Sequence, residues 1–248
     1  MDDSLHGKVA LVTGAARRIG AAIVRQLHGS GANVIVHYRG AEEQAAALEA
    51  ELNAARPGSA LRVKGDLLAP IAPRALVEAA IERWSRLDLL VNNASMFYPT
   101  PVGEIELGHW EELVGSNLRA PLFLSQAAAP HLASAQGSIV NIVDIHAGRP
   151  LKGYLVYSVA KSGLAALTCA LALELAPAVR VNAVAPGAIA WPEDGQFESK
   201  ERERIVASTP LRRTGRPEDI ARAVHFLATA PFVTGHVLAV DGGRSVFA

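Results

Sequence analysis

Short runs of consecutive apolar residues alternate along the chain with segments in which apolar residues recur at every third or fourth position. Val9 to Val12 is one such run, and Ile19, Ile23 and Leu27 follow it at helical spacing. Runs that are apolar at every position are typical of parallel strands covered on both faces, and the segments between them are typical of helices. The alternation predicts an α/β fold built on a doubly wound parallel sheet of about seven strands, with helices on both faces.

The same pattern sets the expected boundaries. Strands are expected at residues 9–12, 34–36, 61–64, 87–91, 138–143, 179–184 and 237–240. Helices are expected at residues 19–28, 41–55, 70–86, 108–133, 154–175 and 217–230, with Pro121 bending or interrupting the fourth. No linker or repeat is visible, so we expect residues 1–248 to form one catalytic domain of the Rossmann type. The least periodic stretch, residues 188–200, is expected to form a substrate loop.

Composition excludes several classes of protein. Half of the 248 residues are hydrophobic, which excludes general disorder, and 24 basic residues balance 24 acidic ones. This balance gives no global electrostatic reason to expect nucleic acid or an anionic membrane as a partner. The start of the chain has no signal-peptide shape and no run of 18 apolar residues exists, so we expect no membrane span and a cytoplasmic protein.

Cysteine and histidine usage gives no sign of a disulfide or a metal. Cys169 is the single cysteine, so no disulfide can form within the chain. It lies between Leu167 and Leu171 in an expected helix, which predicts a small buried residue. The eight histidines show no metal-ligand spacing, and we expect no metal site.

A glycine-containing loop joins the first expected strand to the first helix. Gly14 permits a tight turn, Gly20 permits close approach of helix and strand, and the helix N-terminus offers N–H groups to a pyrophosphate. The spacing differs from G-x-G-x-x-G, so an ordinary strand-to-helix turn is the alternative. The order of strand, loop, helix and strand within the first 36 residues favours a nucleotide site.

The residues at the end of the second expected strand indicate whether the cofactor is NAD or NADP(H). An acidic residue at this place accepts a hydrogen bond from the ribose 2′-hydroxyl and selects NAD. The strand instead runs into His37, Tyr38 and Arg39, with no acid before Glu42. Arg39 and Arg18 can bind a 2′-phosphate through charge-assisted hydrogen bonds, which predicts NADP(H). A solvated Arg39 is the alternative.

Tyr157 and Lys161 form the expected catalytic pair. They are four positions apart and share one face of a helix. A lysine ammonium beside a phenol stabilises the phenolate and lowers the pKa of the tyrosine from about 10, which makes it a proton donor or acceptor near neutral pH. Tyr154 has no such partner, because residue 158 is serine.

In order and spacing, the motifs resemble those of the short-chain dehydrogenase/reductase family over nearly the whole chain. They are Thr13-Gly14-x-x-x-Arg18-x-Gly20, Asp66-Leu67, Asn92-Asn93-Ala94, Asn117, Tyr157-x-x-x-Lys161, Pro186-Gly187 and Asp241-Gly242-Gly243. The resemblance implies a homotetramer and a cofactor site formed by Gly14, Arg18, Ile19, Gly20, His37, Tyr38, Arg39, Asp66, Leu67, Asn93, Ala94, Ser95, Lys161, Pro186 and Gly187.

The resemblance also implies individual roles. Asp66 touches the adenine, Lys161 holds the nicotinamide ribose, and Pro186 with Gly187 flanks the nicotinamide. Asn117 supports a water-linked proton path to the catalytic pair.

Two positions depart from most of the family. Arg18 replaces the middle glycine of the phosphate loop, and Asp144 replaces the serine that lies thirteen positions before the catalytic tyrosine. Both replacements resemble the pteridine reductase branch. So do the segments Asn93-Ala94-Ser95-Met96-Phe97-Tyr98-Pro99-Thr100-Pro101, Asn141-Ile142-Val143-Asp144, Leu151-Lys152-Gly153-Tyr154, Glu174-Leu175-Ala176-Pro177 and Phe232-Val233-Thr234-Gly235.

Asp144 suits an N–H-bearing substrate. A carboxylate would repel a ketone oxygen as negative charge develops on it, whereas it accepts hydrogen bonds from a pterin ring or relays a proton to Tyr157. The alternative is that Asp144 caps the next turn. The resemblance to this branch implies that Phe97 stacks on the pterin and that Ser95 binds the cofactor phosphate or the pterin. Trp191, in the irregular loop, is expected to close over the substrate. A core phenylalanine and a loop-anchoring tryptophan are the alternatives.

These observations predict an NADPH-dependent pteridine reductase. Its expected substrates are dihydropterins such as dihydrobiopterin or dihydromonapterin, or folate and dihydrofolate. The expected catalytic residues are Asp144, Tyr157, Lys161 and Asn117. A carbonyl reductase acting on a β-ketoacyl thioester is the first alternative, and a non-catalytic NADP(H) sensor is the second.

Overall fold

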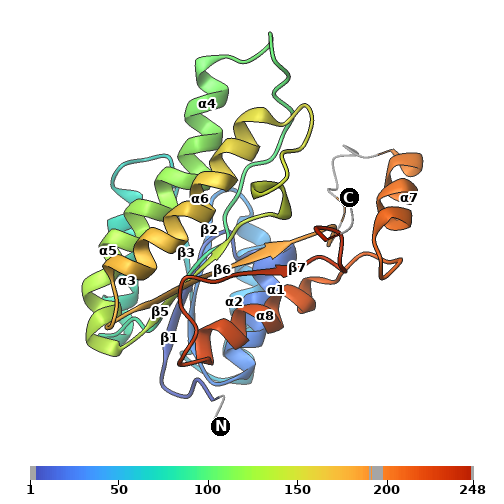
Figure 1. Ribbon diagram of the computed structural model, residues 1–248. Coiled ribbons are helices and arrows are strands. Elements are labelled where there is room, and N and C mark those ends of the chain that lie inside the picture. The colour runs from blue at the N-terminus through green and yellow to red at the C-terminus, as the bar shows by residue number, and fades with distance from the viewer. Residues whose placement is uncertain (1–3, 190, 192–197, 247–248) are drawn as a thin grey trace.

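The computed structural model describes residues 4–189, 191 and 198–246, and all of its named strands lie in one parallel sheet (Figure 1). The strand order is β3-β2-β1-β4-β5-β6-β7. The strands are β1 (Val9–Val12), β2 (Asn33–Tyr38), β3 (Ala60–Lys64), β4 (Leu89–Asn92), β5 (Ser138–Ile142), β6 (Arg180–Pro186) and β7 (Val237–Val240). The predicted doubly wound sheet is confirmed.

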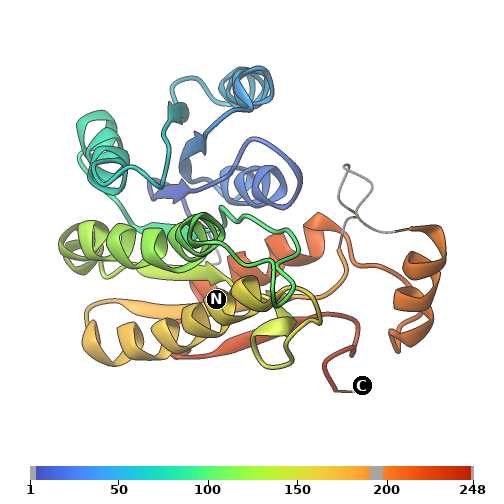
Figure 2. The same cartoon turned by 90° about the horizontal axis from the view of Figure 1, so that it is seen from above.

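Helices cover both faces of this sheet (Figure 2). They are α1 (Arg18–Gly29), α2 (Glu42–Ala55), α3 (Ala72–Trp84), α4 (Leu107–Val114), α5 (Ala120–Ala135), α6 (Leu155–Glu174), α7 (Ser199–Ser208) and α8 (Pro217–Thr229). The helices α1, α2 and α8 pack on one face, and α3, α5 and α6 pack on the other.

Strand β1 shows why its run is apolar throughout. Ala10 and Val12 point into the cluster under α1 and α8, whereas Val9 and Leu11 point into the cluster under α3 and α5. Successive side chains of a strand face opposite sides, so a strand with helices on both sides needs an apolar residue at every position.

The direction of winding reverses between β1 and β4. From β1 the chain winds through β2 to β3 at one edge, and from β4 it winds through β5 and β6 to β7 at the other. In open parallel sheets the loops at such a reversal separate beyond the carboxyl ends of the strands and leave a crevice for ligands. The candidate site is therefore expected beside the ends of β1 and β4.

The segment between α4 and α5 differs from the expected helix over residues 108–133. An interruption is present, but it is the π-helical turn η1 (Gly115–Arg119), which precedes Pro121. Pro121 itself lies in the first turn of α5, where its lack of an N–H group does no harm. The π-turn contains Asn117, a residue of the candidate site.

Helix α6 carries the catalytic pair and also an exposed apolar side. Cys169 is exposed on this helix, so the prediction that it is buried is wrong. By length and composition alone, α6 is the one helix in the described part of the chain that qualifies to cross a membrane, and 44% of that stretch is buried inside the protein. Core helices meet the same test, so this is weak support for a span.

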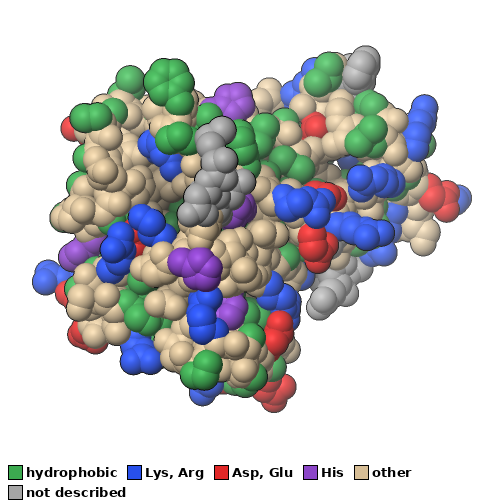
Figure 3. Space-filling model, turned by 90° about the horizontal axis from the view of Figure 1, so that it is seen from below, with side chains coloured by type: hydrophobic (Ala, Val, Ile, Leu, Met, Phe, Trp, Pro, Cys, Tyr) green, Lys and Arg blue, Asp and Glu red, His purple; other side chains and the backbone are tan. Residues whose placement is uncertain are grey.

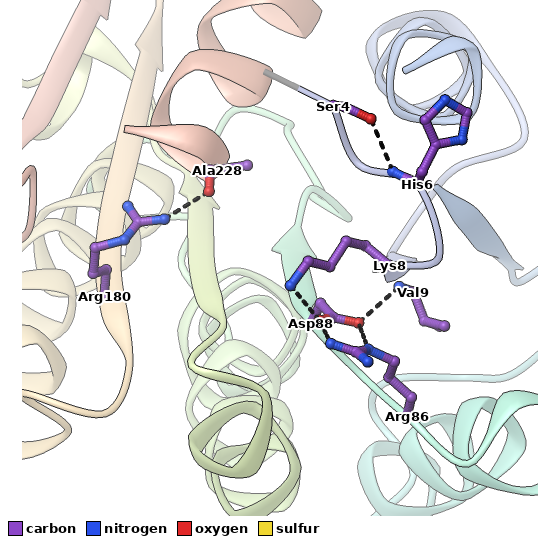
Figure 4. Close-up of polar contacts among 8 residues, drawn as sticks. All are labelled: Ser4, His6, Lys8, Val9, Arg86, Asp88, Arg180 and Ala228. Atoms are coloured by element: carbon purple, nitrogen blue, oxygen red, sulfur yellow. Dashed lines mark hydrogen bonds and ion pairs between the residues drawn. The ribbon is translucent and has the colours of Figure 1, made fainter. Parts of the chain in front are cut away.

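The buried carboxylate of Asp88 connects β1 and β4 at their amino-terminal ends, which are the ends away from the candidate site. Asp88 accepts hydrogen bonds from the N–H of Val9 (2.9 Å) and from Nε of Arg86 (2.7 Å), and Lys8 Nζ lies 3.2 Å away (Figure 4). Burial raises the pKa of Asp88, but the hydrogen bonds from Arg86, Val9 and Lys8 together hold it below its usual value.

On the face viewed from below, basic and acidic side chains are interspersed (Figure 3).

Candidate active site

One large cavity, of about 1390 Å³, runs along the carboxyl ends of the strands. All fifteen residues expected to bind the cofactor line it. Of the five expected substrate residues, Ser95 is already counted with the cofactor residues, and Phe97, Asp144, Tyr157 and Trp191 line the cavity too. Of the predicted site residues, Asn117 is the exception: it is fully buried behind the wall.

The phosphate loop has the close backbone contacts that its glycines predict. Gly14 has a φ of +59°, and a Cβ on Gly20 would lie 2.2 Å from the carbonyl oxygen of Gly14. Arg18 also has a left-handed φ, of +52°, which is unfavourable for a residue with a Cβ atom. Arg18 begins α1, whose first-turn N–H groups have no partners within the helix. The loop therefore offers a cradle for a phosphate.

His37 and Asn93 hold this loop in place. Nδ1 of His37 accepts the N–H of Gly14 (3.1 Å), and Nε2 lies 3.1 Å from the carbonyl oxygen of Gly65. These partners assign the ring proton to Nε2, and burial lowers the pKa of His37. Asn93 donates to the carbonyl oxygens of Thr13 (2.8 Å) and Gly14 (3.0 Å). Both residues line the cavity, and their polar atoms form hydrogen bonds with the protein backbone.

The end of the cavity beside β2 and β3 fits an adenosine with a 2′-phosphate. The exposed guanidinium groups of Arg18 and Arg39 line it, and Arg39 extends to within 3.9 Å of the sulfur of Met96. Asp66 lines it in the turn after β3, where one oxygen accepts the N–H of Leu68 (3.0 Å). Ser116 also lines the cavity, and its buried hydroxyl has no hydrogen-bond partner among the described residues.

At the other end of the cavity, Tyr157 and Asp144 are in direct contact. The Tyr157 hydroxyl donates to Oδ2 of Asp144 at 2.8 Å. Oδ1 of the same carboxylate accepts the N–H of His146 at 2.8 Å, which caps the short helix η2 (Ile145–Ala147). Asp144 therefore does both things that the sequence allowed: it caps the turn and it bonds the tyrosine.

Lys161 lies fully buried beside this pair. Its Nζ donates to the carbonyl oxygen of Ile142 (2.8 Å) and lies 5.8 Å from the centre of the Tyr157 ring. Burial lowers the pKa of Lys161 to about 8, against the opposing effect of Asp144. The ammonium thus faces both the backbone at the end of β5 and the phenol ring.

The pKa of Tyr157 corrects the sequence-based expectation. Burial, then the charge of Asp144 and its hydrogen bond, raise the pKa of Tyr157 well above 10, and a hydrogen bond with Ser95 opposes them. The expected lowering by Lys161 is wrong for this structure, because the carboxylate lies closer to the hydroxyl than the ammonium does. Tyr157 is held as a neutral proton donor.

Three aromatic rings pack together beside the cavity, and two of them, Phe97 and Tyr157, line it. Phe97 stacks on Tyr154, with ring centres 4.5 Å apart and planes 11° apart. The same ring meets Tyr157 edge-on at 4.7 Å. Phe97 thus lines the cavity rather than filling the core. Tyr154 itself does not line the cavity but supports the Phe97 ring from behind, a contact between residues 57 positions apart that no local pattern could predict.

Asn117 fixes the segment that carries Ser95 and Phe97. Its Oδ1 accepts the hydroxyl of Ser95 (2.6 Å), and its Nδ2 donates to the carbonyl oxygens of Met96 and Leu113 (2.9 Å each). The side chain therefore connects to Tyr157 through Ser95, and its place in the π-turn η1 provides the reach.

The expected substrate loop is only partly described. Residues 190 and 192–197 lie outside the described part of the chain. Trp191 lines the cavity, with the guanidinium carbon of Arg202 5.5 Å from the centre of its ring. Helix α7 follows and forms the outer wall of the cavity. Within the described ranges, no three His, Cys, Asp or Glu side chains come together as a metal site.

Comparisons with known proteins find similar chains. The family model described as enoyl-(acyl carrier protein) reductase matches residues 14–245. A protein assigned as ketoacyl reductase 2 of the granaticin polyketide synthase of Streptomyces violaceoruber is 40% identical over 97% of both chains. Pteridine reductase 1 of Leishmania tarentolae is 39% identical over 99% of both.

A solved structure matches the fold over the same length. It is the crystal structure of a blue fluorescent protein from a metagenomic library in complex with NADPH, with a TM-score of 0.90 and 39% sequence identity. The alignment covers 97% of this chain and 99% of that one. At this similarity, the shared fold extends over nearly the whole of both chains.

Proposed function

The chain belongs to the short-chain dehydrogenase/reductase family and is an NADPH-dependent oxidoreductase, and from this premise we propose that it is a pteridine reductase. The relatives include enzymes named for pterin and for ketoacyl substrates at nearly equal identity, so overall similarity does not choose between them. The choice rests on the groups around the reacting bond.

The hydrogen bond between Tyr157 and Asp144 carries the proposal. A ketone oxygen gains negative charge during reduction, and an ionised carboxylate 2.8 Å from the proton donor would oppose that charge. A pterin instead presents a 2-amino group and ring N–H groups, which donate to a carboxylate. Asp144 thus favours a ring nitrogen, with its attached donors, over a carbonyl oxygen as the atom that Tyr157 faces.

The chain's residues divide the work of holding the cofactor. With NADPH bound, Arg18 and Arg39 would hold the 2′-phosphate, the loop at Gly14 and Gly20 would hold the pyrophosphate, and Lys161 would hold the nicotinamide ribose. Bound NADPH supplies a hydride to carbon. Pro186 and Gly187, at the end of β6, line the cavity beside the catalytic helix, where the nicotinamide is expected.

The proton reaches the other atom of the C=N bond from Tyr157. The phenol gives its proton to the ring nitrogen, so that one carbon–hydrogen and one nitrogen–hydrogen bond replace the C=N π bond. The charge of Lys161 then stabilises the phenolate until solvent restores its proton. Asp144 orients the pterin through its N–H groups, and Phe97 provides an aromatic face worth about 0.5–1.5 kcal/mol beyond burial of area.

Oxidation of NADPH, followed optically, tests this assignment. The panel is dihydrobiopterin, dihydrofolate, folate and an acetoacetyl thioester, with wild type, Asp144→Ala and Tyr157→Phe. Turnover of a dihydropterin that falls in both variants supports the proposal. Turnover of the thioester alone assigns the enzyme as a ketoacyl reductase and refutes it.

We further propose that residues 1–248 act as one catalytic domain within a homotetramer. The single sheet supports one domain. Leu122 and Phe123 on α5, with Val159 and Leu173 on α6, are exposed on neighbouring helices that carry few charges, as expected of a face covered by a second copy. Light scattering coupled to gel filtration gives the mass, and Phe123→Glu is expected to lower it.

A further inference from the structure

Two arginines from distant parts of the chain line the substrate end of the cavity. Arg204 lies on α7, and Arg244 follows β7, forty positions later. Figures 1 and 2 both place the C-terminal segment on the α7 side of the sheet. Neither arginine is used by the proposed reaction.

The charges around Arg244 locate it next to the reacting groups. Burial lowers the pKa of Arg244, the carboxylates of Asp144 and Asp241 oppose that effect, and the charge of Arg204 adds to it. Arg244 is therefore within electrostatic reach of Asp144 on one side and of Arg204 on the other. Arg244 is half-buried and Arg204 is exposed, and two like charges this close together favour an anion that binds to both.

The protein supplies little to satisfy these two cations. Among the described residues, no hydrogen bond or ion pair within 4 Å holds either guanidinium group. The Asp241 carboxylate is already engaged by the N–H groups of Gly243 (2.9 Å) and Ser245 (2.6 Å). Glu201, one turn before Arg204 on α7, is the carboxylate in this wall that competes with an incoming anion.

We propose that Arg204 and Arg244 form a subsite for an anionic group, carboxylate or phosphate, carried on the tail of the substrate. Guanidinium groups bind both anions through paired, charge-assisted hydrogen bonds. The inference rests on the proposed function for the identity of the tail. On a pterin, the anion is the glutamate carboxylate of a folate, and on an acyl thioester it is a phosphate of coenzyme A.

Matched substrates separate the tail from the ring. Dihydrofolate carries the glutamate tail, and dihydrobiopterin has a neutral side chain. In Arg204→Ala and Arg244→Ala we expect KM for dihydrofolate to rise at least tenfold more than KM for dihydrobiopterin. Glu201→Gln is expected to lower KM for dihydrofolate, because it removes the competing carboxylate. Arg74→Ala, on an exposed ion pair of α3, is the control and changes neither.

Binding gives a readout that does not depend on turnover. p-Aminobenzoylglutamate is expected to inhibit wild type competitively against dihydrofolate and to lose this effect in Arg244→Ala, with Arg244→Lys intermediate. Equal changes in KM for both pterins would mean that the arginines support the fold or Asp144, and would overturn the subsite. No change for either would overturn it as well.

Failure of the proposed function gives a different pattern. If only the thioester is reduced, the same variants are compared on acetoacetyl-coenzyme A and on a neutral acetoacetyl thioester of N-acetylcysteamine. A larger rise in KM for the coenzyme A ester keeps the anion subsite and assigns phosphate as its ligand. Equal effects on both thioesters reject the subsite.

Discussion

The Tyr157 hydroxyl donates to one oxygen of the Asp144 carboxylate at 2.8 Å, while the other oxygen accepts the backbone N–H of His146 at the same distance. The backbone thereby fixes the carboxylate, and the carboxylate fixes the phenol. Asp144 thus sets the direction of the tyrosine proton, and it adds to the effect of burial in raising the pKa of Tyr157.

Replacing Asp144 is expected to exchange one substrate class for another. Asp144→Ser keeps an oxygen that can cap η2 but removes the charge, so dihydropterin kcat/KM is expected to fall by about 100-fold or more while ketone reduction rises. Asp144→Asn is the matched control, because it keeps shape and cap. Steady-state kinetics on both substrates checks this, and undiminished pterin turnover in Asp144→Ser would contradict the assigned role.

Lys161 makes stability without cofactor depend on pH. Its folded-state pKa of about 8 lies below its usual value of 10.5, so the unfolded chain binds more protons between these pH values. Stability therefore rises as pH increases through this window. In Lys161→Met this rise is expected to disappear along with activity. Urea unfolding at pH 7 to 10 measures it, and parallel curves for the two proteins would contradict the burial argument.

The two arginines at the adenosine end are expected to discriminate between cofactors. Arg39→Ala is expected to raise the Kd for NADPH about tenfold and to leave that for NADH nearly unchanged, because the charge-assisted bonds to the 2′-phosphate are lost. Arg18→Ala is expected to lose the same bonds without a change in backbone strain, because both residues carry a Cβ at the φ of +52° found here. Fluorescence titration with both cofactors tests this, and equal weakening of both would mean that Arg39 shapes the site rather than reads the phosphate.

Asp88 is expected to make a pH-dependent contribution to stability far from the site. Asp88→Asn loses a buried carboxylate that binds Arg86, Lys8 and the Val9 N–H, and is expected to cost about 1–3 kcal/mol at pH 7. Lys8 and Arg86 are both exposed, and this keeps the expected loss of stability in the lower part of that range. The folded-state pKa is depressed, so this stability is present above about pH 4 and is lost as pH falls below it.

Acid and urea unfolding of wild type and Asp88→Asn gives the two curves. They are expected to converge at low pH, and a difference independent of pH would exclude the ionised carboxylate as its cause. Activity is expected to be retained, since Asp88 lies at the opposite ends of the strands.

The sequence pattern predicted the features that neighbouring residues determine, namely strand bounds and the spacing of side chains along a helix. The runs Val9–Val12 and Val237–Val240 became strands with the expected bounds, and helical spacing brought Tyr157 and Lys161 to one cavity. The direction of the Tyr157 pKa shift was missed, because it depends on how deeply the ring is buried and how close Asp144 comes. Exposure of Cys169 depends likewise on which side of α6 meets the sheet.

The sheet reverses its winding between β1 and β4, and the residues for the adenosine half of the coenzyme and the residues for the chemistry lie in different parts of the chain. The phosphate loop, Arg39 and Asp66 lie before residue 70, and Asp144, Tyr157 and Lys161 lie after residue 140. Substitutions in the later segment can therefore change which group is reduced, while the earlier segment keeps its hold on the adenosine and pyrophosphate of the coenzyme. Proteins with similar sequences can then differ in the substrate that they reduce and still use the same coenzyme.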